Sequence, residues 1–287
     1  MNLNFFTWNV KNNSDQRFYE DLNLQLIKDE IDILILQECF QDTHISELVN
    51  YIEIKDYLNS KGQRWVRVFL KKSSLLNHDG QTSYASNKLR CATIETSDNF
   101  KFNLAAIHFY SGAGKTSGQQ LFENRELPGH IKDFEIKQKN EHTLIVGDLN
   151  YRPFDLELIH PDFFNTTSDK SIIRIFKERR MGSFTYRYFY NPMWNLLGDH
   201  NYITRQEKVS GTYYWYADDV GKYNWNLIDG VILSPELMDN VDMESLEIVT
   251  ELNSKSLIKK SLNDSKESLL VKGYSDHLPV RFSIKTI

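Results

Sequence analysis

Polar side chains recur directly after apolar, strand-like runs in this sequence of 287 residues. They are Asn9, Glu38, His108, Asp148 with Asn150, Asp229, and Asp276 with His277. Carboxylates and amides are the hard oxygen ligands that Mg²⁺ prefers, and histidines can contact a phosphate or transfer a proton. Any one of these residues taken alone is more often a turn or cap residue. Because strand ends in α/β proteins converge at one edge of a sheet, the whole set predicts one site there.

The elements that must position these residues alternate between strands and helices. The first ten residues alternate polar and apolar side chains, which predicts a strand. Residues 16–30 carry apolar side chains at helical spacing, with Ser14 or Asp15 as the cap, and residues 31–36 form a nearly continuous apolar run. A strand, a helix and a buried strand in this order are typical of a layered α/β fold.

Later segments repeat this pattern. A helix is expected over 119–139, and the polar stretch 238–272 is expected to be a peripheral connection. Further strands are expected at 65–70, 89–95, 102–109, 143–146, 212–216, 227–233 and 280–284.

Composition narrows the class of protein. The net charge is −5, with 40% hydrophobic and 25% charged residues, which is typical of a soluble globular enzyme. Thirteen glycines and six prolines argue against a flexible linker, so we expect a single domain over residues 1–287. No apolar run approaches the roughly 20 residues that a membrane span needs, and no signal sequence is evident, so we expect a cytoplasmic protein. Cys39 and Cys91 are too few for a disulfide framework and are expected to be buried apolar side chains.

Six short motifs occur in a fixed order along nearly the whole chain. A Gln-Glu pair is weak alone, but the ordered set, with Gly-Asp-Leu-Asn and Ser-Asp-His both intact, is specific. The motifs are Thr7-Trp8-Asn9, Leu36-Gln37-Glu38, Ile107-His108, Gly147-Asp148-Leu149-Asn150, Trp225-Asn226-Leu227-Ile228-Asp229 and Ser275-Asp276-His277-Leu278-Pro279-Val280. In this order they resemble the motifs of the endonuclease/exonuclease/phosphatase superfamily of metal-dependent phosphoesterases.

The resemblance implies a four-layer α/β sandwich in which helices flank two central mixed sheets, with the site at one end between the sheets. It implies that Glu38 is the main ligand of Mg²⁺, for which Mn²⁺ could substitute, and that Asn9 and Asp276 help to bind the metal. It also makes Asp148 the group that orients or deprotonates the attacking water, and Asn150 a donor to the phosphate.

The same resemblance implies roles for two histidines. His277 would contact the scissile phosphate while Asp229 fixes its ring, and His108 would be a second phosphate ligand or a general acid. Phosphodiester hydrolysis needs neutralised charge on the phosphate oxygens, a positioned water and a stabilised leaving oxygen, and the set could supply all three.

The histidine at position 108 resembles that of the deoxyribonuclease, sphingomyelinase and 5-phosphatase branches. In those branches it often has an acidic partner on the preceding strand. Here the corresponding region reads Ser86-Asn87-Lys88-Leu89-Arg90 and has no carboxylate. The group that orients His108 is therefore left open by the sequence.

Several cations and aromatic residues could contact a substrate. The aromatic run Tyr213-Tyr214-Trp215-Tyr216 is expected to alternate between the core and a wall that could stack on bases. The cations that could face the cleft and hold substrate phosphates, with solvated surface charge as the alternative reading, are Lys88, Arg90, Lys115, Arg125 and Arg152.

Three functions remain in competition at this point. The leading hypothesis is a Mg²⁺-dependent phosphodiester hydrolase, a nuclease that cleaves DNA or RNA. The alternative is a phosphatase or phospholipase-C-like phosphodiesterase acting on inositol phosphates, sphingomyelin or another small phosphoester, although no membrane-docking segment supports a lipid substrate. A non-catalytic binding module is disfavoured because each matched position keeps its expected residue.

Overall fold

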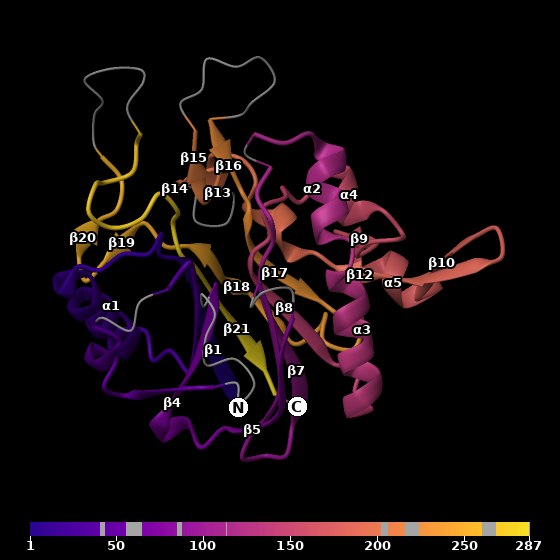
Figure 1. Cartoon of the computed structure of the whole chain (residues 1–287), viewed down its shortest axis with the longest axis horizontal. Coiled ribbons are helices and arrows are strands. Elements are labelled where there is room, and N and C mark those ends of the chain that lie inside the picture. Colours follow the sequence, from indigo (N-terminus) through magenta and orange to yellow (C-terminus); the bar gives the residue numbers. More distant parts are fainter. Residues whose placement is uncertain are drawn as a thin grey trace.

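Two mixed β-sheets face each other at the centre of the fold, and helices cover their outer faces (Figure 1). The arrangement confirms the predicted four-layer α/β sandwich. The structure is a computed structural model that describes residues 1–40, 44–55, 65–84, 88–112, 114–201, 206–215, 224–259 and 268–286. Tyr216, at the end of the predicted aromatic run, lies outside these residues, as do Ser86 and Asn87.

The first sheet has six strands among the described residues, in the order β18-β21-β1-β2-β4-β3. Strands β1 and β2 are parallel and the other pairs are antiparallel. The bounds are β18 (Val241–Ile248), β21 (Val280–Lys285), β1 (Asn2–Asn9), β2 (Ile33–Gln37), β4 (Val66–Lys71) and β3 (Tyr51–Glu53).

The second sheet has seven strands in the described part of the chain, in the order β5-β6-β7-β8-β17-β12-β9. Strands β7 and β8 are parallel, as are β12 and β9. The bounds are β5 (Asn77–Tyr84), β6 (Leu89–Glu95), β7 (Lys101–His108), β8 (Thr143–Asp148), β17 (Asp229–Leu233), β12 (Phe189–Tyr190) and β9 (Thr166–Thr167).

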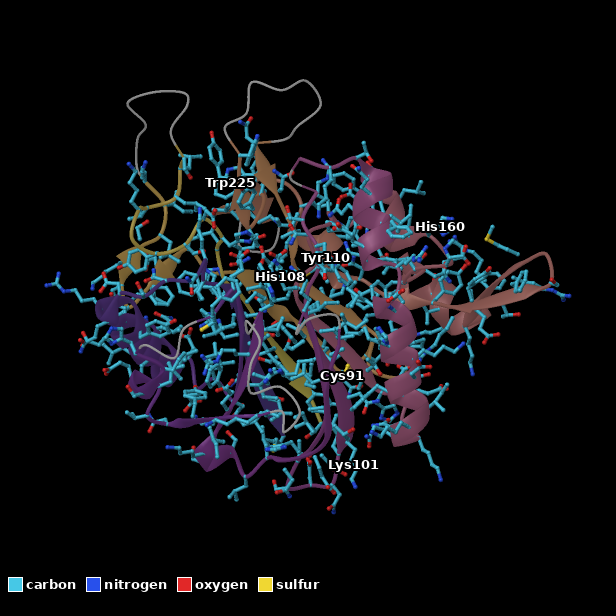
Figure 2. The ribbon with its side chains drawn as sticks, in the orientation of Figure 1. Cys91, Lys101, His108, Tyr110, His160 and Trp225 are labelled. Carbon is cyan, nitrogen blue, oxygen red and sulfur yellow. The ribbon has the colours of Figure 1, made fainter. Side chains whose placement is uncertain are left out.

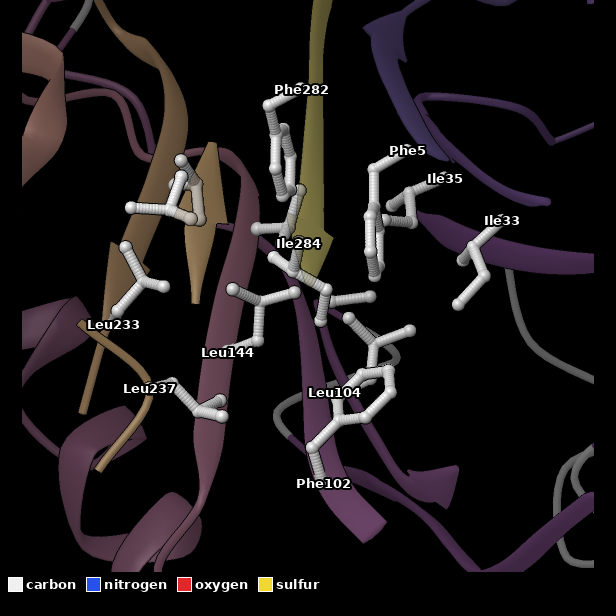
Figure 3. Close-up of a cluster of buried hydrophobic side chains, with 14 of the residues drawn as sticks. Phe5, Ile33, Ile35, Phe102, Leu104, Leu144, Leu233, Leu237, Phe282 and Ile284 are labelled. Atoms are coloured by element: carbon white, nitrogen blue, oxygen red, sulfur yellow. The ribbon is translucent and has the colours of Figure 1, made fainter. Parts of the chain in front are cut away.

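Apolar side chains on the facing sides of the two sheets form the central core (Figure 3). Phe5 and Phe282 of the first sheet stack with ring centroids 4.8 Å apart, and Leu104 and Leu144 of the second sheet belong to the same cluster. Alternate residues of the same strands point outward, as a strand requires. This parity decides which strand-end residues point into the space between the sheets.

Helices cover the outer faces. Helix α1 (Gln16–Lys28) packs Leu22 and Leu26 against the first sheet, and Asp15 is its N-cap, whose side chain accepts a hydrogen bond from the Arg17 N–H. Helix α3 (Leu127–Gln138) packs Ile131 and Phe134 against the second sheet. Cys39 and Cys91 are both buried, as predicted.

Shorter elements complete the described chain. The 3-10 turns are Ile45–Glu47, Lys72–Ser74 and Pro192–Leu196, and the other helices are α2 (Ser117–Asn124), α4 (Leu156–Ile159) and α5 (Lys170–Phe176). The small hairpins are β10 (Glu178–Met181) with β11 (Phe184–Arg187), β13 (His200–Asn201) with β14 (Gln206–Glu207), β15 (Tyr213–Tyr214) with β16 (Trp225–Asn226), and β19 (Glu251–Leu252) with β20 (Lys255–Ser256). None of the helices in the described part of the chain is both long enough and apolar enough to cross a membrane.

Two segments differ from the sequence-based expectation. The predicted helix over 119–139 is two helices, α2 and α3, because Pro128 lies in the first turn of a new helix and Asn124 turns inward to donate to the Tyr110 carbonyl. The stretch 238–272 contains strand β18 at the edge of the first sheet and the hairpin β19–β20. Because an edge strand keeps many polar side chains, β18 lacks the apolar pattern by which the other strands were predicted.

Candidate active site

Four strands bring polar side chains to one end of the space between the sheets. Asn9 lies four residues after the inward-facing Phe5, so it shares the inner face of β1. His108, Asp148 and Asp229 lie two residues from inward-facing apolar residues of β7, β8 and β17. His108 pairs with Asp148 and Asp148 pairs with Asp229 in the strand registers. These three residues therefore form a row across the second sheet.

Asn9 holds two carboxylates side by side. Its Nδ2 donates to Glu38 Oε1 at 3.1 Å and to Asp148 Oδ2 at 2.9 Å, while its Oδ1 accepts from the Lys11 N–H at 3.0 Å. Glu38 lies just past β2 with a φ of 49°, in the left-handed region, and its N–H donates to the Trp65 carbonyl at 2.8 Å. Asn9 thus faces the carboxylates with its nitrogen, whereas the predicted metal-ligand role would use its oxygen.

Asp148 is buried at the centre of the row. Its Oδ1 accepts the Asn150 N–H at 2.9 Å, and the Asn150 Nδ2 donates to the Phe109 carbonyl at 2.9 Å. Burial and the nearby Asp229 carboxylate raise the pKa of Asp148 well above its ordinary value. A carboxyl group with such a pKa can take up and release a proton near neutral pH.

His277 is bound to Asp229 through Nδ1. The distance from Nδ1 to Asp229 Oδ2 is 2.8 Å, and Thr212 Oγ1 donates to the same oxygen at 2.6 Å. Burial alone lowers the pKa of His277, but the carboxylates of Asp229 and then Asp148 outweigh it and raise the pKa above its ordinary value. The ring is therefore an imidazolium at neutral pH, and its Nε2 is the nitrogen that Asp229 does not hold.

The Ser-Asp-His motif is tied to strand β1. Ser275 Oγ donates to the Asn9 carbonyl at 2.6 Å and accepts the His277 N–H at 3.1 Å. Trp8 Nε1 donates to the His277 carbonyl at 2.8 Å. Asp276 forms an ion pair with Lys11, whose Nζ is 2.5 Å from Asp276 Oδ2, so part of its negative charge is already compensated.

His108 lies between carboxylates and a lysine. Its Nε2 is 3.5 Å from both Glu38 Oε1 and Asp148 Oδ2, and its Nδ1 is 3.5 Å from Lys88 Nζ. Burial, Lys88 and His277 hold the pKa of His108 well below its usual value, whereas burial lowers the pKa of Lys88 to about 8. Figure 2 shows His108 and Tyr110 at the end of β7 opposite to Lys101.

A cavity of about 470 Å³ opens onto these residues. Glu38, His108, Asp148, Asn150, Asp276 and His277 line it, together with Tyr213 and Trp215. The Tyr213 and Trp215 rings lie 6.0 Å apart with 30° between their planes, and Tyr213 lies 4.9 Å from the His277 ring. Tyr214 packs instead against Trp225, in the core cluster under α1. The alternation predicted for residues 213–215 is thus present.

The structure brings only some of the predicted cations to the cavity. Arg152 lines it and pairs with Asp155 at 2.8 Å, whereas Lys88 is buried behind His108. Lys115 pairs with Glu123 outside the cavity lining. Arg90 is buried away from the cavity, with a guanidinium nitrogen 2.9 Å from the Ile54 carbonyl, because the inner face of β6 packs against the first sheet. Arg125 stacks on Phe122 at 3.9 Å and does not line the cavity.

The residues present fit a divalent cation with a preference for oxygen ligands. Oxygens of Glu38 and Asp148 lie within 4.8 Å of each other and of a His108 nitrogen. Glu38 is the more accessible of the two carboxylates, with its side chain 29% exposed. Both cysteines lie buried elsewhere, so the carboxylate oxygens of Glu38 and Asp148 are the candidate ligands, a set compatible with Mg²⁺ or Mn²⁺.

Sequence reasoning missed three residues of the site. Thr212 has no motif of its own, and its hydrogen bond to Asp229 depends on the pairing of Thr212, just before β15, with Asn226 at the end of β16. Lys11 follows Asn9 closely, but only the structure places it against Asp276. Trp65 lies just before β4 and packs against the central core, and its ring also lies 5.2 Å from the His108 ring.

Comparisons with known proteins place this geometry in a fold family. No family model matches the sequence, and a search of curated proteins finds no relative. The truncated TDP2 of Caenorhabditis elegans is 15% identical with a TM-score of 0.57, and the match covers 100% of this chain and 98% of that one. An endonuclease/exonuclease/phosphatase family protein of Bacteroides thetaiotaomicron is 15% identical with a TM-score of 0.61, covering 99% and 98%. A mannosyl-6-phosphatase of the same organism is 15% identical with a TM-score of 0.58, covering 99% and 100%. The chain has the fold of the endonuclease/exonuclease/phosphatase superfamily.

Proposed function

We propose that this chain is an enzyme that hydrolyses phosphodiester bonds of DNA or RNA with the help of Mg²⁺ or Mn²⁺. The observation that carries the proposal is the convergence of Glu38, Asp148 and the His277–Asp229 pair on one cavity. These residues come from both sheets, and their chemistry matches the needs of phosphodiester hydrolysis.

Each side chain has a distinct part in the proposed reaction. A divalent metal, when bound beside Glu38, supplies positive charge that polarises the phosphate. Asp148 accepts the proton of the attacking water, because its raised pKa makes it a base suited to neutral pH. His277 donates from Nε2 to a phosphate oxygen while Asp229 holds Nδ1, and Asn150 has a second amide proton to donate.

Two observations support a nucleic acid as the substrate. Tyr213 and Trp215 present aromatic faces beside His277, where a base next to the scissile phosphate could stack. A solved structure of similar fold, the TDP2 of D. rerio, holds a single-stranded DNA product and is 16% identical with a TM-score of 0.53, covering 99% of both chains.

A phosphatase of small phosphoesters is the second candidate. The cavity of about 470 Å³ is large enough for a sugar phosphate, and Arg152 on its lining could bind a terminal phosphate. A structural neighbour is a mannosyl-6-phosphatase, whose name describes such a substrate.

An activity panel separates the two candidates. The protein with Mg²⁺ or Mn²⁺ is incubated with supercoiled DNA, linear DNA, RNA, an inositol polyphosphate, sphingomyelin and mannose 6-phosphate, with the Asp148→Asn variant as the matched control. Cleavage of a nucleic acid by the wild type alone supports the proposal. Turnover of only a small phosphoester favours the second candidate, and no turnover of any substrate contradicts both.

A further inference from the structure

Lys88 occupies the position beside His108 where the sequence offers no carboxylate. It is buried, with 6% of its surface exposed, and its Nζ lies 3.5 Å from His108 Nδ1. The ammonium group lies 3.9 Å from the centroid of the Trp65 ring and 4.5 Å from that of Tyr110. The Lys88 carbonyl also accepts the His108 N–H at 2.8 Å, so both the backbone and the side chain of Lys88 fix this histidine.

The surroundings of the ring define which nitrogen carries the proton. An ammonium group only donates hydrogen bonds, so the nitrogen that faces Lys88, Nδ1, must accept. The nitrogen that faces Glu38 Oε1 and Asp148 Oδ2 is Nε2, and both oxygens already act as acceptors, because Asn9 Nδ2 donates to each of them. A cation at one nitrogen and two carboxylates at the other thus favour the same tautomer. The two aromatic rings stabilise the lysine as a cation away from water.

We propose that Lys88 is a positioning residue that holds His108 as a neutral imidazole with its proton on Nε2. In this form His108 is a hydrogen-bond donor toward the carboxylates and an incoming phosphate oxygen. An acidic partner would favour the opposite tautomer, with the proton on Nδ1, and would stabilise an imidazolium suited to general-acid catalysis. Lys88 therefore selects the phosphate-ligand role for His108 over the general-acid role. The tautomer follows from the geometry alone, whereas its catalytic consequence rests on the proposed function.

Nitrogen NMR of the free protein tests the tautomer without reference to activity. The protein is labelled with ¹⁵N-histidine, and the His108 signals are assigned by their loss in His108→Asn. At about pH 7 we expect the wild type to show a protonated Nε2 and an unprotonated, hydrogen-bonded Nδ1. In Lys88→Glu the new carboxylate should draw the proton to Nδ1, whereas Lys88→Arg should keep the wild-type pattern. Lys101→Met, at the opposite end of β7, is the matched control.

The outcomes separate the inference from the proposed function. A wild-type His108 with its proton on Nδ1, or an unchanged pattern in Lys88→Glu, overturns the inference. If Lys88→Glu does not fold, Lys88→Met provides the test, because loss of the ammonium group removes the hydrogen bond to Nδ1 and should shift the Nδ1 signal to that of an unprotonated nitrogen without this partner. An Nδ1 signal in Lys88→Met identical to that of the wild type would also overturn it.

Kinetics then test the consequence for catalysis. Lys88→Met should lower kcat by roughly 10- to 100-fold with a smaller change in KM, and Lys88→Arg should restore most of the rate. In a His108→Ala background, Lys88→Met should have no further effect, since it acts through the ring. Additive losses would contradict a positioning role. Absence of any hydrolysis would reject the proposed function and leave the NMR result standing.

Discussion

Asp148 on β8 and Asp229 on β17 are direct partners in the antiparallel register, so two buried carboxylates lie side by side at the end of the second sheet. His277 approaches from the loop before β21 and binds only Asp229, through Nδ1. The pair thus divides into an Asp229–His277 ion pair and a second carboxylate, Asp148, whose pKa is raised by burial and by its neighbour. Two carboxylates in one row can therefore have different roles, one orienting a cation and one transferring a proton.

Removal of the proposed base or of the phosphate-contacting cation should stop turnover without unfolding the protein. We expect Asp148→Asn and His277→Ala each to lower kcat by roughly 10² to 10⁴. The midpoint of thermal unfolding should change little, because the apolar rows behind these strand ends form the core. Circular dichroism during heating, together with initial rates, provides the measurement. Full activity in either variant would show that the assigned role is wrong.

Glu38→Gln should raise the metal concentration that gives half-maximal rate. The substitution keeps the shape and removes the charge of the more accessible of the two carboxylates to which Asn9 donates. Initial rates are measured over a Mg²⁺ titration, with Glu178→Gln on the β10–β11 hairpin as the control. Identical titrations for the wild type and Glu38→Gln would exclude Glu38 as the main ligand. Full turnover after exhaustive chelation would exclude a metal requirement altogether.

Gly147→Ala should destabilise the fold beside the site. Gly147 has a φ of 143°, and a Cβ placed there would lie 2.0 Å from the Ile107 carbonyl oxygen. Either β7 and β8 must separate or Asp148 must shift, so we expect a loss of at least about 2 kcal/mol in the free energy of unfolding. Urea unfolding measures the loss. Gly129→Ala on α3, where a Cβ meets no atom within 4 Å, is the control and should not lose stability.

Asp98 should make the stability of the sandwich dependent on acid pH. It lies in the turn between β6 and β7, and its hydrogen bonds with Thr96 and Thr286 lower its pKa to about 2 from 3.8. Because the folded state holds the ionised form, the stabilisation is present above pH 3.8 and is lost as the pH falls toward 2. The denaturation midpoint of the wild type should therefore exceed that of Asp98→Asn at about pH 6, and the difference should shrink below about pH 4. A difference that does not vary with pH would contradict this assignment.

Local periodicity predicted a layered α/β fold and the polar residues at its strand ends, whereas the four layers and the roles of those residues followed from the resemblance of the ordered motifs. Val146 and Asp148 share a face by parity alone, and motif order singled out Asp148 as a site residue. The break between helices α2 and α3 was not predicted, because the inward turn of Asn124 depends on its hydrogen bond to the Tyr110 carbonyl.

The sequence could not supply partners that meet only through tertiary packing. The sequence placed the region of Lys88 on the strand before His108, but it did not show that the Lys88 side chain contacts the ring. The direction in which the Arg90 side chain points depends on how closely the first sheet approaches. Both lysine and arginine are expected at a surface from their charge, yet both are buried here. Burial of a cation is set by the whole fold and has no local signature in the sequence.

The aromatic wall provides the sharpest test of a nucleic-acid substrate. Tyr213 and Trp215 line the cavity, whereas Tyr214 between them packs on Trp225. Substitutions of the first two should therefore change substrate affinity, and substitution of Tyr214 should change stability. Tyr213→Ala and Trp215→Ala should each weaken binding of a labelled single-stranded oligonucleotide by about 1 to 3 kcal/mol, the value of one lost stacking contact. Tyr214→Ala should lower thermal stability and leave that affinity nearly unchanged.

Oligonucleotide affinity is measured at several salt concentrations, with Ca²⁺ in place of Mg²⁺ to suppress turnover. Arg152→Ala should reduce the slope of log affinity against log salt concentration by about 1 if Arg152 binds a backbone phosphate. A flat salt response with no detectable oligonucleotide binding would reject the nuclease and leave the small phosphoester as the substrate class to pursue.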